Sequence, residues 1–269
     1  MKIAISGKGG VGKTFIAGNL ATRFAETGRA VIAIDADPSP NLAFALGLSA
    51  EEAGRIVPVA ENSGLIRLKT GTPNPGVFRL TFSVDDVIAS AAVPTPSGAN
   101  LMVMGTVRAA GAGCTCPAHA VIRALLRHLI VERGEVVIMD MEAGIEHLGR
   151  GTAGHVDLLL IVSDANLRSL AVAGTIASLA RDLGIPRIGL VGNRVAGGRQ
   201  QDAIHAFAGE HGIEVLALIP FDVAVADGGL TGRTPGKDRS AAVRAIAGLA
   251  DRLLAPPPEE QTAGNPETP

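Results

Sequence analysis

The chain has 269 residues and a formal net charge of −2, and 47% of its residues are hydrophobic, although it contains only seven Phe and no Trp or Tyr. This length and the aliphatic composition predict one α/β domain with a sizeable core, because such domains often exceed about 200 residues. The near-neutral charge and the scarcity of aromatic side chains argue against nucleic acid as a partner, since binding it requires a basic surface or rings on which bases stack.

The amino-terminal residues do not resemble a signal peptide, because their apolar run ends at Ser6. The longest strongly apolar run, residues 156–162, is too short to span a bilayer, so we expect no membrane partner. Two cysteines in a chain without a leader favour thiol or metal chemistry over a disulfide framework. We therefore expect a cytoplasmic protein.

Short apolar runs rich in Val and Ile alternate with helical patterns along the chain, which is typical of βαβ units. They predict a single domain over residues 1–254, with a mostly parallel, doubly wound sheet of about seven or eight strands flanked by helices. Strands are expected at residues 2–6, 30–35, 101–104, 135–140, 156–162, 187–193 and 215–219. Helices are expected at residues 13–27, 117–133, 167–183, 199–210 and 238–254.

Two segments depart from this alternation. Residues 49–100 hold five prolines and one strand-like run at 65–69, and we expect them to form an irregular insertion packed on the domain. Residues 255–269 are polar and rich in proline, a composition that is typical of a disordered tail.

The first predicted strand leads into a run that satisfies the phosphate-loop pattern G-x-x-x-x-G-K-[ST], namely Gly7-Lys8-Gly9-Gly10-Val11-Gly12-Lys13-Thr14. Its glycines allow a tight turn with N–H groups pointing at phosphates, and the helix N-terminus that follows favours negative charge. Lys13 is expected to reach the β- and γ-phosphates, and the hydroxyl of Thr14 to bind Mg²⁺. The sequence therefore predicts a nucleoside triphosphate site.

Two later strands end in carboxylates. The strand at 30–35 is followed by Asp35-Ala36-Asp37-Pro38, where carboxylates beside a phosphate loop could hold the waters of Mg²⁺ or orient the attacking water. A pair of turn-forming aspartates is the alternative. The strand at 135–140 has the Walker B pattern, so Asp140 is expected to hold the magnesium through water.

The only cysteines, Cys114 and Cys116, lie two residues apart, before Pro117, which is well suited to begin a helix. Thiols at a helix N-terminus have a lowered pKa and so favour metal binding. One pair supplies two of the four ligands of a tetrahedral site, and a two-fold dimer would supply four. A monomeric site with His119, a redox pair and two unrelated cysteines remain alternatives.

The run K-G-G-V-G-K-T, with its early lysine, resembles the deviant Walker A loop of the MinD/ParA/nitrogenase-reductase class of ATPases. The resemblance implies a homodimer in which Lys8 reaches the partner's nucleotide, as an arginine finger does. It also implies that Lys13 and Asp37 are catalytic, Asp37 by positioning water, and that Asp35 supports magnesium from the outer shell. Phe15 replaces the Ser or Thr of many members, which removes one phosphate contact.

The same class implies the remaining nucleotide contacts. Gly144, in the loop after the Walker B strand, is expected to offer its N–H to the γ-phosphate. The amide of Asn193, which can donate and accept at once, and the P-x-D pair Pro220 and Asp222 are expected to frame the adenine. An ordinary strand-to-helix turn is the alternative for that pair. Glu142 is unusual for the class and is either a sensor of metal or partner, or simply solvated.

The C-x-C-P motif, together with D-M-E-A-G-I-E-H-L-G-R-G after the Walker B strand, is similar to the CooC-type ATPases over roughly residues 1–254. That resemblance implies a dimerisation-coupled ATPase that forms ADP and phosphate and binds Zn²⁺ or Ni²⁺ at the paired Cys114 and Cys116. It also implies a role in nickel insertion into carbon monoxide dehydrogenase. The alternative is a related ATPase with an intersubunit iron–sulfur cluster for electron transfer, whose ligands come from two distant loops.

Overall fold

The computed structural model describes residues 1–70, 84–105, 116–131, 134–145, 153–231, 235 and 239–255. The predicted tail beyond residue 255 and the prolines at 73 and 75 lie outside these residues. Within the described part of the chain, no helix is both long enough and apolar enough to cross a membrane.

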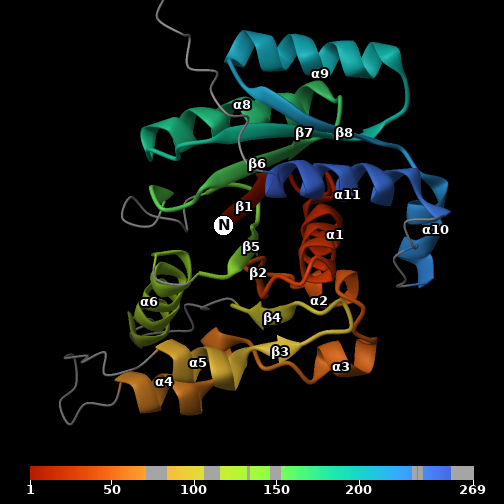
Figure 1. Ribbon diagram of the computed structural model, residues 1–269. Coiled ribbons are helices and arrows are strands. Elements are labelled where there is room, and N and C mark those ends of the chain that lie inside the picture. Colours follow the sequence, from red (N-terminus) through yellow and green to blue (C-terminus); the bar gives the residue numbers. More distant parts are fainter. Residues whose placement is uncertain are drawn as a thin grey trace, which may run out of the picture.

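An eight-stranded sheet forms the centre of the described structure (Figure 1), in the order β3-β4-β2-β5-β1-β6-β7-β8. Every neighbouring pair runs parallel except β3 and β4, which are antiparallel. The strands are β1 Lys2–Gly7, β2 Val31–Asp35, β3 Val93–Pro94, β4 Asn100–Val103, β5 Val136–Asp140, β6 Leu158–Ser163, β7 Ile188–Val195 and β8 Glu214–Pro220. The predicted α/β fold and all seven predicted strands are confirmed.

Helices cover both faces of this sheet. They are α1 Lys13–Glu26, α2 Leu42–Ala45, α3 Ala50–Gly54, α4 Ser63–Thr70, α5 Val84–Ala91, α6 Cys116–Val131, α8 Leu167–Asp182, α9 Gly198–His211, α10 Val223–Thr231 and α11 Ala241–Leu254, with a 3₁₀ turn at Val59–Glu61. The five predicted helices correspond to α1, α6, α8, α9 and α11.

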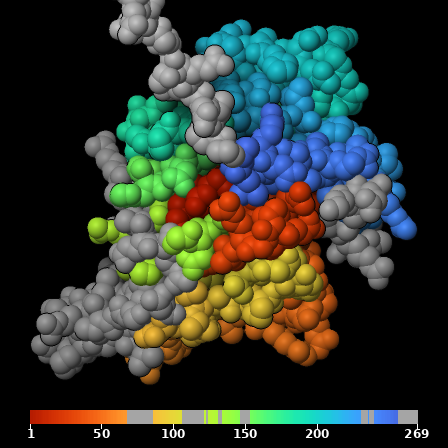
Figure 2. All heavy atoms as spheres, in the orientation of Figure 1, coloured from red at the N-terminus to blue at the C-terminus, as the bar shows by residue number. Residues whose placement is uncertain are grey.

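The two faces of the sheet carry separate apolar cores because side chains alternate along each strand. Ala4 of β1 belongs to the core that α6, α8 and α9 cover, whereas Ile3 and Ile5 belong to the core beneath α1 and α11. Figure 2 shows α1 and α11 side by side on the surface, where Arg23 donates two hydrogen bonds to Asp251. This is the doubly wound arrangement, which places the strand-to-helix loops along the carboxyl edge of the sheet.

The strand-like run at 65–69 forms no strand, because these residues lie within helix α4. The side-chain oxygen of Asn62 accepts a hydrogen bond of 2.9 Å from the amide of Leu65, as a residue that caps a helix does. Leu65 is buried, and α4 packs against α6. A polar cap and a one-sided apolar contact therefore outweighed the strand-like composition of this short run.

Helix α1 approaches α2 closely at Gly18, and this contact yields a stability prediction. A Cβ at Gly18 would lie 2.5 Å from the Cβ of Ala45, whereas a Cβ at Gly248 in α11 would meet nothing within 4 Å. Alanine in a helix interior is favoured over glycine by up to about 1 kcal/mol. We expect Gly248→Ala to stabilise the protein by about that amount and Gly18→Ala to destabilise it, as measured by urea unfolding. Stabilisation by both substitutions would contradict the close packing of α1 on α2.

Candidate functional site

Three glycines between β1 and α1 have main-chain angles that other residues adopt only with strain. Gly7, Gly10 and Gly12 have φ angles of 151°, 80° and 96°. A Cβ at Gly7 would lie 2.2 Å from the carbonyl oxygen of Val162, and one at Gly12 would lie 2.3 Å from the side-chain nitrogen of Asn193. A Cβ at Gly9 or Gly10 would meet no atom within 4 Å, so the middle of the loop is open. This combination of a tightly packed base and an open backbone suits a phosphate chain.

The two lysines of the loop lie in different environments. Lys13 is 7% exposed, and its Nζ donates a hydrogen bond of 3.3 Å to the main-chain carbonyl of Lys8. Lys8 itself is partly exposed. The ammonium group of Lys13 is therefore already folded back over the loop, as a group that meets bound phosphates must be.

The hydroxyl of Thr14 donates a hydrogen bond of 2.6 Å to Oδ2 of Asp140, at the end of β5. The second carboxyl oxygen, Oδ1, is buried and has no hydrogen-bond partner among the described groups. Burial raises the pKa of Asp140 to about 7, the bond from Thr14 opposes this rise, and the charge of neighbouring Asp35 adds to it. A buried carboxyl oxygen without a partner, beside a hydroxyl, fits Mg²⁺, which prefers oxygen ligands and would offset the lost hydration.

Asp35 binds the loop that follows β2 rather than lying free. Its side chain is fully buried, and its two oxygens accept hydrogen bonds from the amides of Asp37 at 3.1 Å and Leu42 at 2.9 Å. Burial nevertheless raises the pKa of Asp35 above its ordinary value. Asp37 is partly exposed, and its Oδ1 accepts a bond of 2.8 Å from the amide of Ser39. Asp35 thus shapes the loop that carries Asp37, and its outer-shell role stays a prediction.

Gly144 lies in the loop after β5, against the end of β1. The hydroxyl of Ser6 contacts both its carbonyl oxygen and its amide. Sequence reasoning did not identify Ser6, because a serine before a phosphate loop belongs to no motif and its partner is 138 residues away. This hydroxyl therefore bonds the loop after β5 to the end of β1, directly before the phosphate loop.

The residues predicted to frame adenine make structural hydrogen bonds. Asn193 is 4% exposed, and its Nδ2 donates a bond of 2.7 Å to the carbonyl of Val11 in the phosphate loop. Asp222 accepts bonds from the hydroxyl of Ser240 at 2.7 Å and the amides of Ala224 and Ala242 at 2.9 and 3.1 Å. These bonds, that from Ser240 foremost, hold the pKa of Asp222 below its usual value.

Asp222 therefore joins the starts of α10 and α11, which favours the structural alternative for this residue. Pro220 ends β8. The adenine contacts of Asn193, Pro220 and Asp222 stay predictions.

The predicted Cys-x-Cys site falls largely outside the described residues. Cys114 lies outside them, whereas Cys116 begins helix α6, so the helix starts where Pro117 predicts it. In the part of the chain that the structure does describe, no three His, Cys, Asp or Glu side chains gather closely enough to hold a metal ion.

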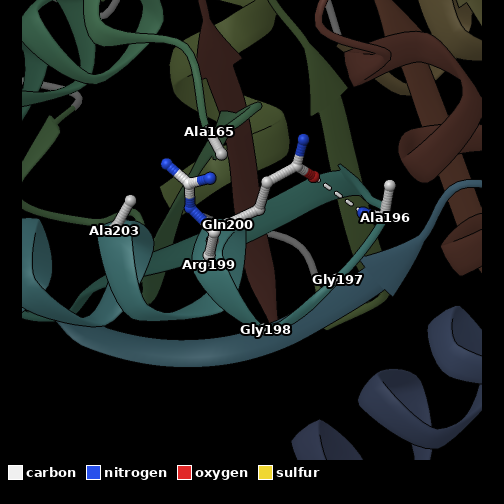
Figure 3. Close-up of a pocket in the computed structure, with 7 residues that line it drawn as sticks. All are labelled: Ala165, Ala196, Gly197, Gly198, Arg199, Gln200 and Ala203. Carbon is white, nitrogen blue, oxygen red and sulfur yellow. Dashed lines mark hydrogen bonds between the residues drawn. The ribbon is translucent and has the colours of Figure 1, made fainter.

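A cavity of about 560 Å³ opens at the ends of β6 and β7 (Figure 3). It is lined by Ala165, Ala196, Gly197, Gly198, Arg199, Gln200 and Ala203. The side-chain oxygen of Gln200 accepts a bond of 2.7 Å from the amide of Ala196 across its rim. None of the predicted site residues lines it.

The raised pKa of Asp140 predicts a pH-dependent cost of folding. Between its ordinary pKa of 3.8 and about 7 the unfolded chain loses this proton first, so stability falls as pH rises, and the full cost is present above pH 7. Asp140→Asn keeps an acceptor for Thr14 and removes the charge. With magnesium chelated, we expect it to stabilise the protein more at pH 8 than at pH 5, by roughly 2–3 kcal/mol.

Thermal unfolding at the two pH values measures this difference. Asp202→Asn, the same carboxylate-to-amide change at an exposed position of α9, provides the control. Equal effects of Asp140→Asn at both values would mean that the carboxylate is hydrated despite its burial.

Comparisons with known proteins agree with this geometry. Residues 2–235 match the CobQ/CobB/MinD/ParA nucleotide binding domain family. The chain is 47% identical over 227 residues to the carbon monoxide dehydrogenase accessory protein CooC of Rhodospirillum rubrum, covering 84% of this chain and 85% of that protein. It is 44% identical over 246 residues to an uncharacterised ATP-binding protein of Methanocaldococcus jannaschii, covering 90% and 93%.

Among solved structures, the MinD cell division protein of Aquifex aeolicus shares the fold, with a TM-score of 0.68 at 21% identity, over 96% of this chain and 99% of that one. The family match spans the phosphate loop, the Thr14–Asp140 pair and the loops around them. The chain therefore belongs to the CobQ/CobB/MinD/ParA family of nucleotide-binding domains, and within it to the CooC-type ATPases.

Proposed function

We propose that this ATPase is an accessory factor for carbon monoxide dehydrogenase, which assists nickel insertion by carrying the metal at a Cys-x-Cys site shared by two protomers. The observation that carries the proposal is the glycine loop backed by the Thr14–Asp140 pair, in a chain related to CooC along most of its length. Cys114 and Cys116 add thiols, which suit Zn²⁺ or Ni²⁺ better than Mg²⁺.

ATP and Mg²⁺ are the ligands that the site residues fit. The amides of residues 7–14 and the ammonium group of Lys13 hold the phosphates, and Phe15 offers no hydroxyl to them. Thr14 would bind the magnesium directly, Asp140 would hold it through water, and Asp35 would support it from the outer shell. Bound magnesium neutralises charge on the phosphates.

Hydrolysis to ADP and phosphate requires a positioned water and added positive charge. Asp37 orients the water, and the loop that carries it is held by two main-chain hydrogen bonds to Asp35, which supports this assignment. The amide of Gly144 donates to the γ-phosphate. Lys8, partly exposed at the open side of the loop, neutralises the partner's nucleotide when two protomers meet.

The action of Lys8 across the dimer predicts complementation between two inactive variants. Lys8→Ala and Asp37→Ala should each bind ATP and lose turnover, Lys8→Ala by a factor on the order of 10³, as for loss of an arginine finger. In a mixture, one composite site combines the intact Asp37 of one chain with the intact Lys8 of the other. We expect phosphate release to recover on mixing, and no recovery at any ratio would contradict action across the dimer.

The carried metal is expected at the dimer axis, because one Cys-x-Cys motif offers two ligands and a tetrahedral site takes four. Zn²⁺ suits four thiolates in a tetrahedral arrangement, and Ni²⁺ can accept them in a square plane. Nucleotide and metal would then each favour the dimer, and linkage requires that each strengthens the binding of the other by the same factor.

Replacing both cysteines tests this site. Cys114→Ser with Cys116→Ser should lose the metal, weaken the dimer and abolish nickel activation of the dehydrogenase, while the monomer still binds ATP. Elemental analysis and mass measurements with and without nucleotide should give one metal per wild-type dimer. One metal per monomer, unchanged on dilution, would instead support a site that includes His119.

The same preparation distinguishes the electron-transfer alternative. A [4Fe–4S] cluster between protomers would give a coloured protein that contains iron and sulfide, whereas a Zn²⁺ or Ni²⁺ thiolate site contains neither. Iron in stoichiometric amount would therefore reject the nickel-carrier proposal.

A further inference from the structure

Ser6 is fully buried near the end of β1, directly before the first glycine of the phosphate loop. Its hydroxyl oxygen lies 2.8 Å from the carbonyl oxygen of Gly144 and 3.2 Å from the amide nitrogen of the same residue. A serine hydroxyl donates one hydrogen and accepts others. One side chain therefore satisfies both main-chain polar groups of Gly144.

The loop around Gly144 is anchored on either side of this contact. The amide of Met141 donates a bond of 3.0 Å to the carbonyl of Ile5, and Met141 and Ile145 are both buried. Between these anchors the chain turns through Gly144, whose φ of 117° lies in a region that glycine adopts without strain. The ends of the loop are thus held, and the glycine between them can adopt main-chain angles that a residue with a Cβ rarely adopts.

The amide of Gly144 carries one hydrogen, so it cannot bind Ser6 and a γ-phosphate well at the same time. We propose that Ser6 is a positioning residue, which holds the Gly144 amide in the nucleotide-free and ADP-bound protein and releases it when ATP binds. The inference deepens the proposed function and rests on it only through the assignment of the Gly144 amide to the γ-phosphate.

This exchange makes ATP binding weaker than it would be without Ser6. A hydrogen bond to an anionic phosphate is roughly twice as strong as one to a neutral hydroxyl, so the γ-phosphate displaces Ser6. ADP lacks that acceptor and leaves the Ser6 bond in place. A ligand shifts an equilibrium only by its differential affinity for the two states, here the Gly144 amide bound to Ser6 and released from it. The Ser6 bond therefore opposes the binding of ATP and not that of ADP.

Removing the hydroxyl should therefore change nucleotide preference. We expect Ser6→Ala to raise the ratio of the ADP to the ATP dissociation constant by about threefold to tenfold, the range that follows from the net free energy of one hydrogen bond. If Ser6 had only a structural role, its replacement would weaken the binding of ATP and of ADP by the same factor. Ser6→Cys, which keeps nearly the same volume and bonds weakly, should shift the ratio in the same direction by less and serves if the alanine variant does not fold.

Ser163 provides a matched control. It is also fully buried at the end of a parallel strand, β6, and its hydroxyl donates a bond of 2.8 Å to the carbonyl of Asp164 instead of contacting Gly144. Titration calorimetry with Mg–ADP and a non-hydrolysable ATP analogue on wild type, Ser6→Ala and Ser163→Ala gives the three ratios. Of the two variants, only Ser6→Ala should differ from wild type in the ratio of the two dissociation constants.

Amide hydrogen exchange at Gly144 gives a second readout. Without nucleotide, exchange should be faster in Ser6→Ala than in wild type or Ser163→Ala, and with the ATP analogue Ser6→Ala and wild type should agree. An unchanged affinity ratio or unchanged exchange in Ser6→Ala, with normal wild-type binding, would overturn the Ser6 role alone. Wild-type protein that bound neither nucleotide would overturn the nucleotide site and the Ser6 role together.

Discussion

The carboxyl ends of β2, β5 and β1 lie next to one another in the sheet, and this adjacency places the charged groups of the site. Asp35 and Asp140 are paired in register on β2 and β5, and Thr14 reaches Asp140 from the start of α1. Right-handed crossovers in a parallel sheet bring such strand ends to one edge whatever the length of the connections. Residues more than a hundred positions apart therefore meet within hydrogen-bond distance.

The same adjacency has a cost. Burial raises the pKa of both Asp35 and Asp140, and the charge of Asp35 raises the pKa of Asp140 further. Main-chain amides satisfy the oxygens of Asp35, whereas Oδ1 of Asp140 is left without a partner among the described groups. The unsatisfied polar group thus lies at the carboxyl that the Walker B pattern assigns to magnesium, where a bound cation would offset the cost of burial.

Buried side chains on the strands also hold the loops of the site in position. Asp35 holds the loop that bears Asp37, Ser6 holds Gly144, and Asn193 holds the phosphate loop at Val11. In each case a side chain on a rigid strand bonds to the main chain of a loop. A phosphate oxygen, which accepts, can take the amide of Gly144 from Ser6, whereas the carbonyl of Val11 is itself an acceptor and keeps its bond from Asn193.

The sequence by itself determined the α/β class, all seven predicted strands, the five main helices and the position of the phosphate loop, because these depend on local apolar periodicity and on glycine spacing. It misjudged residues 65–69, where composition resembles a strand but a cap at Asn62 and packing on α6 form a helix. Only the tertiary structure revealed Ser6 and the helix-joining bonds of Asp222, and only it showed which oxygen of Asp140 is unpaired. Those features are hydrogen bonds between residues distant in sequence, and no local pattern encodes which partners the folded sheet brings together.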